Sequence, residues 1–110
     1  MQPKKIALLA RELGLDKKAE SPVILNLGKL TSVAHYFVVL HGNSDRHVRA
    51  IAQHIVDSLK AQKVKLWHLE GMDTAQWVLL DFGDVIVHIF YAPVREFYNL
   101  ERLWGDAGRL

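Results

Sequence analysis

Histidine and aspartate are the residue types in this chain that could support acid–base or metal chemistry. Six histidines are present and cysteine is absent, which excludes disulfides, thiolate metal sites and a cysteine nucleophile. His47 and His54 are expected on the polar side of one helix, but a spacing of seven residues separates them by about 10.5 Å along the helix axis. No HxxxH or HExxH motif occurs. We therefore predict no metal site and no cofactor, and we interpret the surface histidines as solvated.

The turn Gly42–Ser44, with the sequence Gly-Asn-Ser, is the feature most suited to phosphate chemistry, because free backbone N–H groups at a helix N-terminus attract anions. A glycine-serine turn between a strand and a helix also occurs in nucleotidyltransferases, which need paired carboxylates on a following strand to hold metal ions. The strand expected next, Lys65–Glu70, has one carboxylate, at its end, and no Asp-x-Asp. We therefore interpret the turn as a helix cap and predict no enzymatic activity. The alternative is a nucleotidyltransferase-like enzyme that uses this turn for phosphate, with Asp45 and Glu70 as its available carboxylates.

Two β-rich runs joined by Gly83 and Asp84 predict a tight antiparallel hairpin over residues 77–90. Its register places a wholly apolar set of side chains on one face: Val78, Leu80, Phe82, Val85, Val87 and Ile89. The opposite face carries Trp77, Leu79, Asp81, Ile86, His88 and Phe90. On that face Asp81 and His88 are the pair best suited to general acid–base catalysis, but they are diagonal rather than opposite, and we predict no catalytic residues. A face of this composition either lies under a helix or binds a partner.

Hydrophobic periodicity predicts the elements that precede the hairpin. Apolar residues at helical spacing indicate a helix from Ile6 that ends at Gly14, followed by polar, turn-like residues as far as Pro22. Strands are expected at 23–27 and 36–40, and the second is apolar throughout, as in a central strand buried on both faces. Ser44 then caps an amphipathic helix whose apolar residues are Val48, Ile51, Ala52, Ile55, Val56 and Leu59.

The remaining segments complete an α/β fold. Residues 64–69 are expected to return as a strand parallel to 36–40, in a right-handed βαβ unit. After the hairpin, Pro93 begins a last helix with Phe97, Leu100 and Trp104 on one stripe. We predict a single domain, residues 1–110, in which flanking helices pack on a mixed sheet of about five strands.

Composition is that of an ordinary globular protein. Half of the residues are hydrophobic and 24% are charged. The net charge of +2 is too small, and the basic residues are too evenly spread, to indicate a nucleic-acid-binding protein. No apolar run reaches membrane-spanning length, and the first residues do not have the pattern of a secretory or transit signal. We expect a cytoplasmic protein without membrane contact, a location that suits a chain without cysteine.

Motifs along most of the chain form a series of defined order and spacing. They are Ser32-x-x-x-Tyr36-Phe37-Val38, Gly42-Asn43-Ser44 with Val48-x-x-Ile51-Ala52, Glu70-Gly71, Ala75-x-Trp77, Asp81-x-Gly83-Asp84-Val85-x-Val87-His88 and Arg95-x-Phe97-Tyr98-x-Leu100-Glu101-x-Leu103-Trp104. The series, which covers residues 6–104, resembles the ribosomal silencing factors, also called the Iojap-related family. No single motif is specific, but their combination is. One departure is His35, where the family usually has Asp.

The resemblance implies a nucleotidyltransferase-like fold that lacks the catalytic carboxylates and has no enzymatic activity. It also implies binding to the large ribosomal subunit through that subunit's fourteenth protein, at the face that meets the small subunit. A factor bound there sterically blocks joining of the subunits and represses translation when nutrients are scarce. If the family's Asp contacts the ribosome, that contact is altered here by His35.

The resemblance and the hairpin face together predict a partner-binding patch centred on Trp77, because tryptophan buries a large area at low entropic cost. Around it we expect Leu79, Asp81, Met72 and Glu70, with Asp81 meeting a basic group on the ribosomal protein, His88 at the rim, and Tyr98 and Arg95 flanking the patch from the last helix. The alternative is that Trp77, Leu79 and Phe90 form ordinary core beneath the last helix, with Tyr98 and Arg95 solvated.

RNA and a second copy of the chain are further candidate partners. Arg46 and Arg49 could reach neighbouring ribosomal RNA. A dedicated RNA-binding domain ranks last, because the hairpin carries no lysine or arginine between its aromatic residues. An apolar patch used part of the time on the ribosome could also pair with a second copy, so a homodimer is a further candidate assembly.

Overall fold

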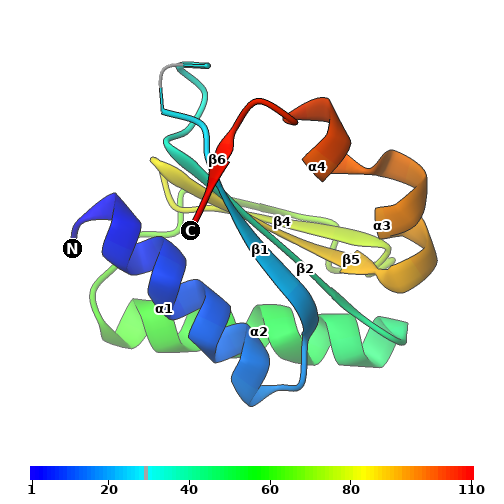
Figure 1. The fold of residues 1–110 in the computed structure, drawn as a ribbon. Helices are drawn as coiled ribbons and strands as arrows, with labels where there is room; N and C mark the ends of the chain where they lie inside the picture. Colours follow the sequence, from blue (N-terminus) through cyan, green and yellow to red (C-terminus); the bar gives the residue numbers. More distant parts are fainter. Residues whose placement is uncertain (29) are drawn as a thin grey trace.

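The computed structural model describes residues 1–28 and 30–110. Its strands form one mixed sheet in the order β3-β4-β5-β2-β1-β6. They are β1 (Glu20–Asn26), β2 (Tyr36–Gly42), β3 (His68–Glu70), β4 (Trp77–Asp81), β5 (Val85–Tyr91) and β6 (Gly108–Arg109). Helices α1 (Pro3–Asp16) and α2 (Asp45–Ala61) cover one face of the sheet, and the short helices α3 (Ala92–Tyr98) and α4 (Leu100–Leu103) lie over the other (Figure 1). The predicted α/β architecture is confirmed, with two-residue β6 as an additional edge strand.

The predicted hairpin is formed by β4 and β5 in the predicted register. Val78 pairs with Ile89, and the Phe82 N–H donates to the carbonyl oxygen of Val85 at 2.9 Å. The apolar face of the hairpin lies under α1 and α2, where it joins the larger of two hydrophobic clusters. Full burial of one such side chain contributes about 1.5–3 kcal/mol. A register shifted by one residue would turn this face to solvent and is therefore strongly disfavoured.

Strand β2 and helix α2 also match the expectation from sequence. β2 is buried along nearly its whole length between β5, to which it is parallel, and β1, to which it is antiparallel. The Ser44 Oγ accepts a hydrogen bond from the His47 N–H at 3.0 Å and caps α2. Five of the predicted apolar residues of α2, Val48, Ile51, Ala52, Ile55 and Leu59, are buried, and Val56 is partly buried beside them.

The predicted βαβ unit is wrong. The chain that leaves α2 forms only the three-residue strand β3, at the edge of the sheet and antiparallel to β4. The neighbour of β2 is instead β5, the last long strand of the chain. The physical reason is burial: apart from His88, β5 carries buried apolar side chains on both faces and gains most from a central position, whereas all three residues of β3 are exposed and suit an edge.

Three predicted boundaries also differ. Helix α1 continues past Gly14, which is buried so closely against Leu40 that an added Cβ would overlap the Leu40 side chain. Strand β1 begins at Glu20, within the segment expected to be a turn, and has an irregular register before Val23. The last helix breaks at Asn99, whose φ is 46°, so the predicted stripe is interrupted between α3 and α4. None of the helices in the described residues has the length and apolar character to cross a bilayer.

Gly71 is the tightest backbone position next to β4. Its φ is +89°, and a Cβ added there would overlap the carbonyl oxygen of Trp77. We expect Gly71→Ala to lower the free energy of unfolding by about 2–4 kcal/mol, because alanine is strained at positive φ and the overlap forces the backbone apart. Urea unfolding measures the loss. The matched control is Gly108→Ala, whose Cβ would lie 4.0 Å from its nearest neighbour. Equal losses in both variants would contradict this account of Gly71.

Candidate functional site

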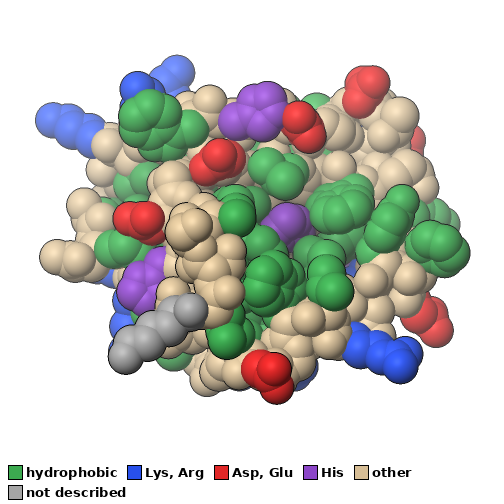
Figure 2. Space-filling view, turned by 90° about the horizontal axis from the view of Figure 1, so that it is seen from above, with side chains coloured by type: hydrophobic (Ala, Val, Ile, Leu, Met, Phe, Trp, Pro, Cys, Tyr) green, Lys and Arg blue, Asp and Glu red, His purple; other side chains and the backbone are tan. Residues whose placement is uncertain are grey.

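The sheet face opposite α1 and α2 carries a second, smaller hydrophobic cluster. Its buried residues are Leu25, Leu27, Ala34, Phe37, Val39, Ile86, Phe90 and Leu100, and partly buried Trp77, Leu79, Val94 and Trp104 pack around them. Helices α3 and α4 and the C-terminal residues lie over this face. In the space-filling view, hydrophobic side chains gather across its middle (Figure 2). This face is therefore partly core and partly open surface.

Trp77 lies where the covered and open parts of this face meet. It is the first residue of β4 and pairs across the hairpin with Phe90. Its ring centroid is 4.9 Å from that of Phe90 and 4.8 Å from that of Tyr98. Its indole N–H donates to Nδ1 of His88 at 3.1 Å. The indole is half-buried, so neither of the two expectations, ordinary core or fully open patch, describes it completely.

His88 lies beneath the surface rather than at its rim, with only 4% of the residue exposed. Its ring is 4.5 Å from Phe37 in an edge arrangement. Burial lowers the pKa of His88 from 6.5 to about 4, so the imidazole is neutral at pH 7. Because Nδ1 accepts the Trp77 hydrogen bond, Nε2 carries the proton, and this atom is buried without a partner. The pair with Asp81 is not formed: His88 faces Leu79, and Asp81 Oδ1 accepts the Gly83 N–H at 2.8 Å.

Leu79 and Glu70 lie on one side of Trp77, whereas Asp81 lies at the other end of β4. Leu79 is half-buried and pairs directly with Glu70 of β3. Glu70, Gly71, Trp77 and Leu79 line an open hollow of about 260 Å³. The Glu70 carboxylate lies 2.7 Å from Nε2 of His68. An apolar floor with an acidic side chain at its border suits a partner that offers an apolar group beside a basic one.

Met72 is not brought to this hollow. Its side chain packs against the cluster under α1 and α2. Its carbonyl oxygen accepts a hydrogen bond from Arg49 Nε at 2.9 Å. Arg49 also donates to the carbonyl of Asp73 and to the carboxylate of Asp45. The arginine expected to reach RNA therefore holds the turn before β4 in place.

A second hollow lies on the other side of Trp77. It has a volume of about 470 Å³ and is lined by Gln76, Trp77, Pro93, Val94, Phe97 and Tyr98. Phe97 is 82% exposed, although its helical spacing predicted a core-facing stripe. The signal that could have revealed this is Asn99, a residue type that tolerates the left-handed conformation and interrupts the stripe. Leu103 is exposed as well, so α3 and α4 extend the apolar surface.

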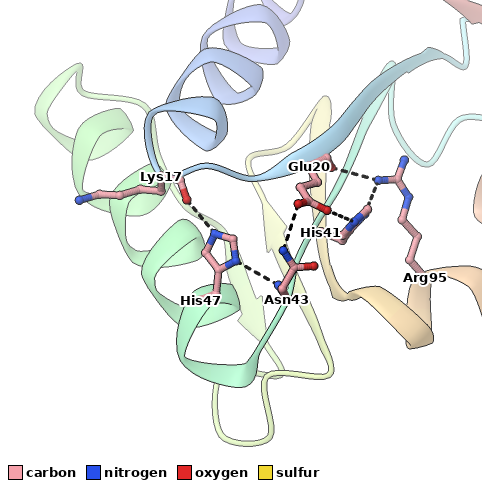
Figure 3. A network of polar contacts seen from close by, with 6 residues as sticks. All are labelled: Lys17, Glu20, His41, Asn43, His47 and Arg95. Atoms are coloured by element: carbon pink, nitrogen blue, oxygen red, sulfur yellow. Dashed lines mark hydrogen bonds and ion pairs between the residues drawn. The ribbon is translucent and has the colours of Figure 1, made fainter.

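Arg95 points into the molecule instead of flanking the patch. Its side chain is 11% exposed. Nη1 donates to Nδ1 of His41 at 2.9 Å and to the carbonyl oxygen of Glu20 at 3.3 Å (Figure 3). Nε donates to Glu101 Oε1 at 3.3 Å. Helix α3 has no buried residue of its own, so these polar contacts hold the helix that presents Phe97 and Tyr98.

The residues that Arg95 contacts, His41 and Glu20, are also connected to the layer formed by α1 and α2. Hydrogen bonds from the Asn43 side chain and then from His41 lower the pKa of the exposed Glu20 carboxyl. Asn43 in turn donates its N–H to Nδ1 of His47 at 3.0 Å, and Nε2 of His47 lies 2.8 Å from the Lys17 carbonyl oxygen (Figure 3). His47 is thus a bridge between α1 and α2 and not the solvated surface histidine that was expected.

The Gly42–Ser44 turn has few N–H groups left for a phosphate. The Asn43 and His47 N–H groups are bonded within the turn, and the Arg46 N–H donates to Asp45 Oδ1 at 2.8 Å. That hydrogen bond, followed by the one from Arg49, lowers the pKa of the exposed Asp45 carboxyl and keeps a negative charge at the helix start. Among residues 1–28 and 30–110 no group of three or more His, Asp or Glu side chains could hold a metal ion. The arrangement is that of a helix cap.

We expect acid to destabilise the fold through His88. Its pKa is about 4 in the folded chain and 6.5 ordinarily, so between these values only the unfolded chain takes up the proton. Stability is therefore retained above pH 6.5 and falls as the pH drops towards 4. Urea unfolding at pH 7.5 and pH 5 should show a loss of about 2 kcal/mol that is missing in His88→Gln, whose amide oxygen can still accept the indole N–H. The same pH dependence in both chains would disprove this.

Comparison with known proteins places this chain in a family. A family model described as "Ribosomal silencing factor during starvation" matches residues 2–110. The chain is 45% identical over 107 residues to the protein named Ribosomal silencing factor RsfS of Bacillus subtilis (strain 168), covering 97% of this chain and 91% of that one. A crystal structure of a protein from Chromobacterium violaceum has a TM-score of 0.93 at 38% identity, covering 96% of this chain and 88% of that chain.

A more distant relative carries a name that refers to the large subunit. The mouse protein named Mitochondrial assembly of ribosomal large subunit protein 1 is 36% identical over 72 residues, which are 63% of this chain and 32% of that protein. The bacterial relatives are named as silencing factors and not as enzymes. The match of the family model to nearly the whole length, together with this degree of identity to a bacterial relative, shows that the chain belongs to the ribosomal silencing factor family.

Proposed function

We propose that this chain represses translation by binding the large ribosomal subunit through its fourteenth protein and sterically blocking the small subunit. The observation that carries the proposal is the half-open Trp77 between two hollows, one with Leu79 and Glu70 and one with Phe97 and Tyr98. A rigid aromatic side chain with apolar neighbours on both sides has the properties of an interface anchor. Membership of the silencing factor family supports the ribosome as the target.

The central side chain of the proposed interface is held in one position. The Trp77 indole is fixed by the hydrogen bond to His88 and by ring contacts with Phe90 and Tyr98. Fixing a large side chain before binding removes part of the entropic cost of association, which is about 0.5–1.5 kcal/mol for each immobilised side chain. Glu70 borders the apolar floor and favours a partner with a basic group. The name of the mouse relative supports the large subunit as the particle that is bound.

The proposed mechanism requires no chemistry. In the turn that could have bound phosphate, the N–H groups of Asn43, Arg46 and His47 donate to side chains of the protein itself. On the Trp77 face, Asp81 and His88 are not arranged as an acid–base pair. The chain, acting as one binding unit in the cytoplasm, represses translation only while it occupies the subunit surface. Its effect therefore follows its concentration and its affinity.

We expect Trp77→Ala to weaken binding to large ribosomal subunits by about 30- to 1000-fold, because truncation of a central anchor costs about 2–4 kcal/mol. Co-sedimentation of purified chain with large subunits measures this. Trp77→Phe keeps a ring against Phe90 and Tyr98 and should lose less affinity. Circular dichroism establishes that both variants are folded. A folded Trp77→Ala chain that binds as tightly as the unmodified chain would remove Trp77 from the interface.

A charge placed on the open face should abolish the block to subunit joining. We expect Leu79→Lys to restore joining of the two subunits in gradient sedimentation, because a partner surface with a basic group would repel the new charge and leave it desolvated. The matched control is Leu15→Lys, which makes the same change at an exposed leucine of α1, on the opposite face of the sheet. Loss of the block in both variants, or in neither, would refute this placement of the interface.

A further inference from the structure

The segment between α2 and β3 presents cations and an aromatic ring on one side. Lys63, Lys65 and Trp67 are exposed, whereas Val64 and Leu66 between them are partly buried against the cluster under α1 and α2. Alternation of this kind places Lys65 and Trp67 on the same side, next to Lys63 in the turn that follows α2. Lys60 in the last turn of α2 adjoins them, since its carbonyl oxygen accepts the Lys63 N–H at 2.9 Å. We name Lys60, Lys63, Lys65 and Trp67 the lysine–tryptophan strip.

Trp67 is held in place and yet open to solvent. Its residue is 63% exposed, and its backbone N–H donates to the Asp81 carbonyl oxygen at 2.8 Å. The indole lies beside Gly83, where an added Cβ would be 3.4 Å from Nε1. Lys65 Nζ lies 3.7 Å from the ring centroid. An exposed indole with a cation over it has a flat surface that accepts a second ring and a positive charge that accepts an anion.

The lysines of the strip are not neutralised by the protein itself. All ion pairs within the described residues use Arg or His as the cation, and none uses a lysine. The carboxylates of the neighbouring strands have other partners, because Glu70 pairs with His68 and Asp81 accepts the Gly83 N–H. Asp84, which follows Gly83 in the hairpin turn, is an exposed carboxylate and takes part in none of these ion pairs. The positive charge of Lys60, Lys63 and Lys65 is therefore available to an external anion.

We propose that the lysine–tryptophan strip binds single-stranded RNA, with lysines against successive phosphates and one unpaired base stacked on Trp67. Aromatic side chains interleaved with lysines are the pattern by which proteins bind unpaired nucleotides. That pattern is missing from the hairpin but present in the segment before it. A protein partner fits the strip less well, because lysine is depleted from protein–protein interfaces. The strip lies at the Asp81 end of β4, whereas Trp77 begins that strand, so the two surfaces are separate.

The test is direct titration of the full chain with a fluorescently labelled RNA of twelve uridines at several salt concentrations from 50 to 200 mM, with polarisation as the readout. We expect Trp67→Ala to weaken binding about tenfold, the usual effect of removing one stacking ring. The double variant Lys63→Asn with Lys65→Gln should reduce the slope of log affinity against log salt by about 1.4, or about 0.7 for each phosphate that the chain no longer neutralises.

A matched pair controls for net charge and backbone strain. Lys18 and Lys63 both have positive φ, 61° and 62°, a conformation that asparagine tolerates. Lys17→Gln with Lys18→Asn therefore removes the same charge at the other end of the helical layer and should leave both the affinity and the salt slope unchanged. Urea unfolding of each variant tests the fold. If Trp67→Ala proves unstable, the exposed lysine pairs alone decide the matter.

Three results would overturn the proposal. The first is no binding of the RNA by the unmodified chain at 50 mM salt. The second is an equal loss in the two lysine pairs, which would mean attraction by net charge only. The third is weaker binding of large subunits by the strip variants without any binding of RNA alone, which would mean a protein contact. Trp77→Ala should keep its full affinity for the RNA, so the outcome is independent of the proposed protein interface.

Discussion

The antiparallel register between β4 and β5 decides which side chains reach the open face of the sheet. With Val78 opposite Ile89 and Leu80 opposite Val87, six apolar side chains enter the core under α1 and α2, and Trp77, Leu79 and His88 point to the other side. A shift of one residue would exchange these two sets. The burial of the apolar set therefore stabilises the fold and, in the same step, fixes the position of the proposed anchor.

The open face is supported in two different ways. On the sheet, Trp77 is held by packed rings and by a neutral, buried His88, an arrangement that costs an unpaired Nε2–H beneath the surface. On the helical side, α3 contributes no buried residue and is held mainly through Arg95, which contacts His41, Glu20 and Glu101. Half of the proposed interface thus rests on the hydrophobic core and half on a polar network at the end of β2. Regions with few buried apolar contacts open most easily, so we expect α3 to open more readily than the sheet.

The two proposed surfaces differ in chemistry as well as position. The Trp77 face is apolar with an acidic border, which suits a basic protein. The lysine–tryptophan strip is cationic with one ring, which suits a phosphate backbone. They lie at opposite ends of β4, and a particle made of both protein and RNA offers partners for both. Two separate contacts on one rigid sheet would raise the overall affinity beyond that of either one alone.

Local patterns predicted much of this fold. The Gly83-Asp84 turn and the alternation around it specified the hairpin and its faces, and the period of α2 specified its buried side and its Ser44 cap. The neighbour of β2 was not predicted correctly, since β3 took an edge position and β5 paired with β2. Strand order depends on which segment gains most from central burial, and that comparison involves residues far apart in the chain.

The candidate site shows the same division. The residue types of the Trp77 face, its lack of a paired acid and base, and its likeness to a known family could all be read from the chain. The tertiary structure alone decided that Trp77 is half-open, that His88 is buried and neutral, that Met72 and Arg95 point away, and that Phe97 is exposed. The physical reason is that a repeating pattern assigns a side chain to a face of its own element, whereas exposure depends on what other elements pack against that face.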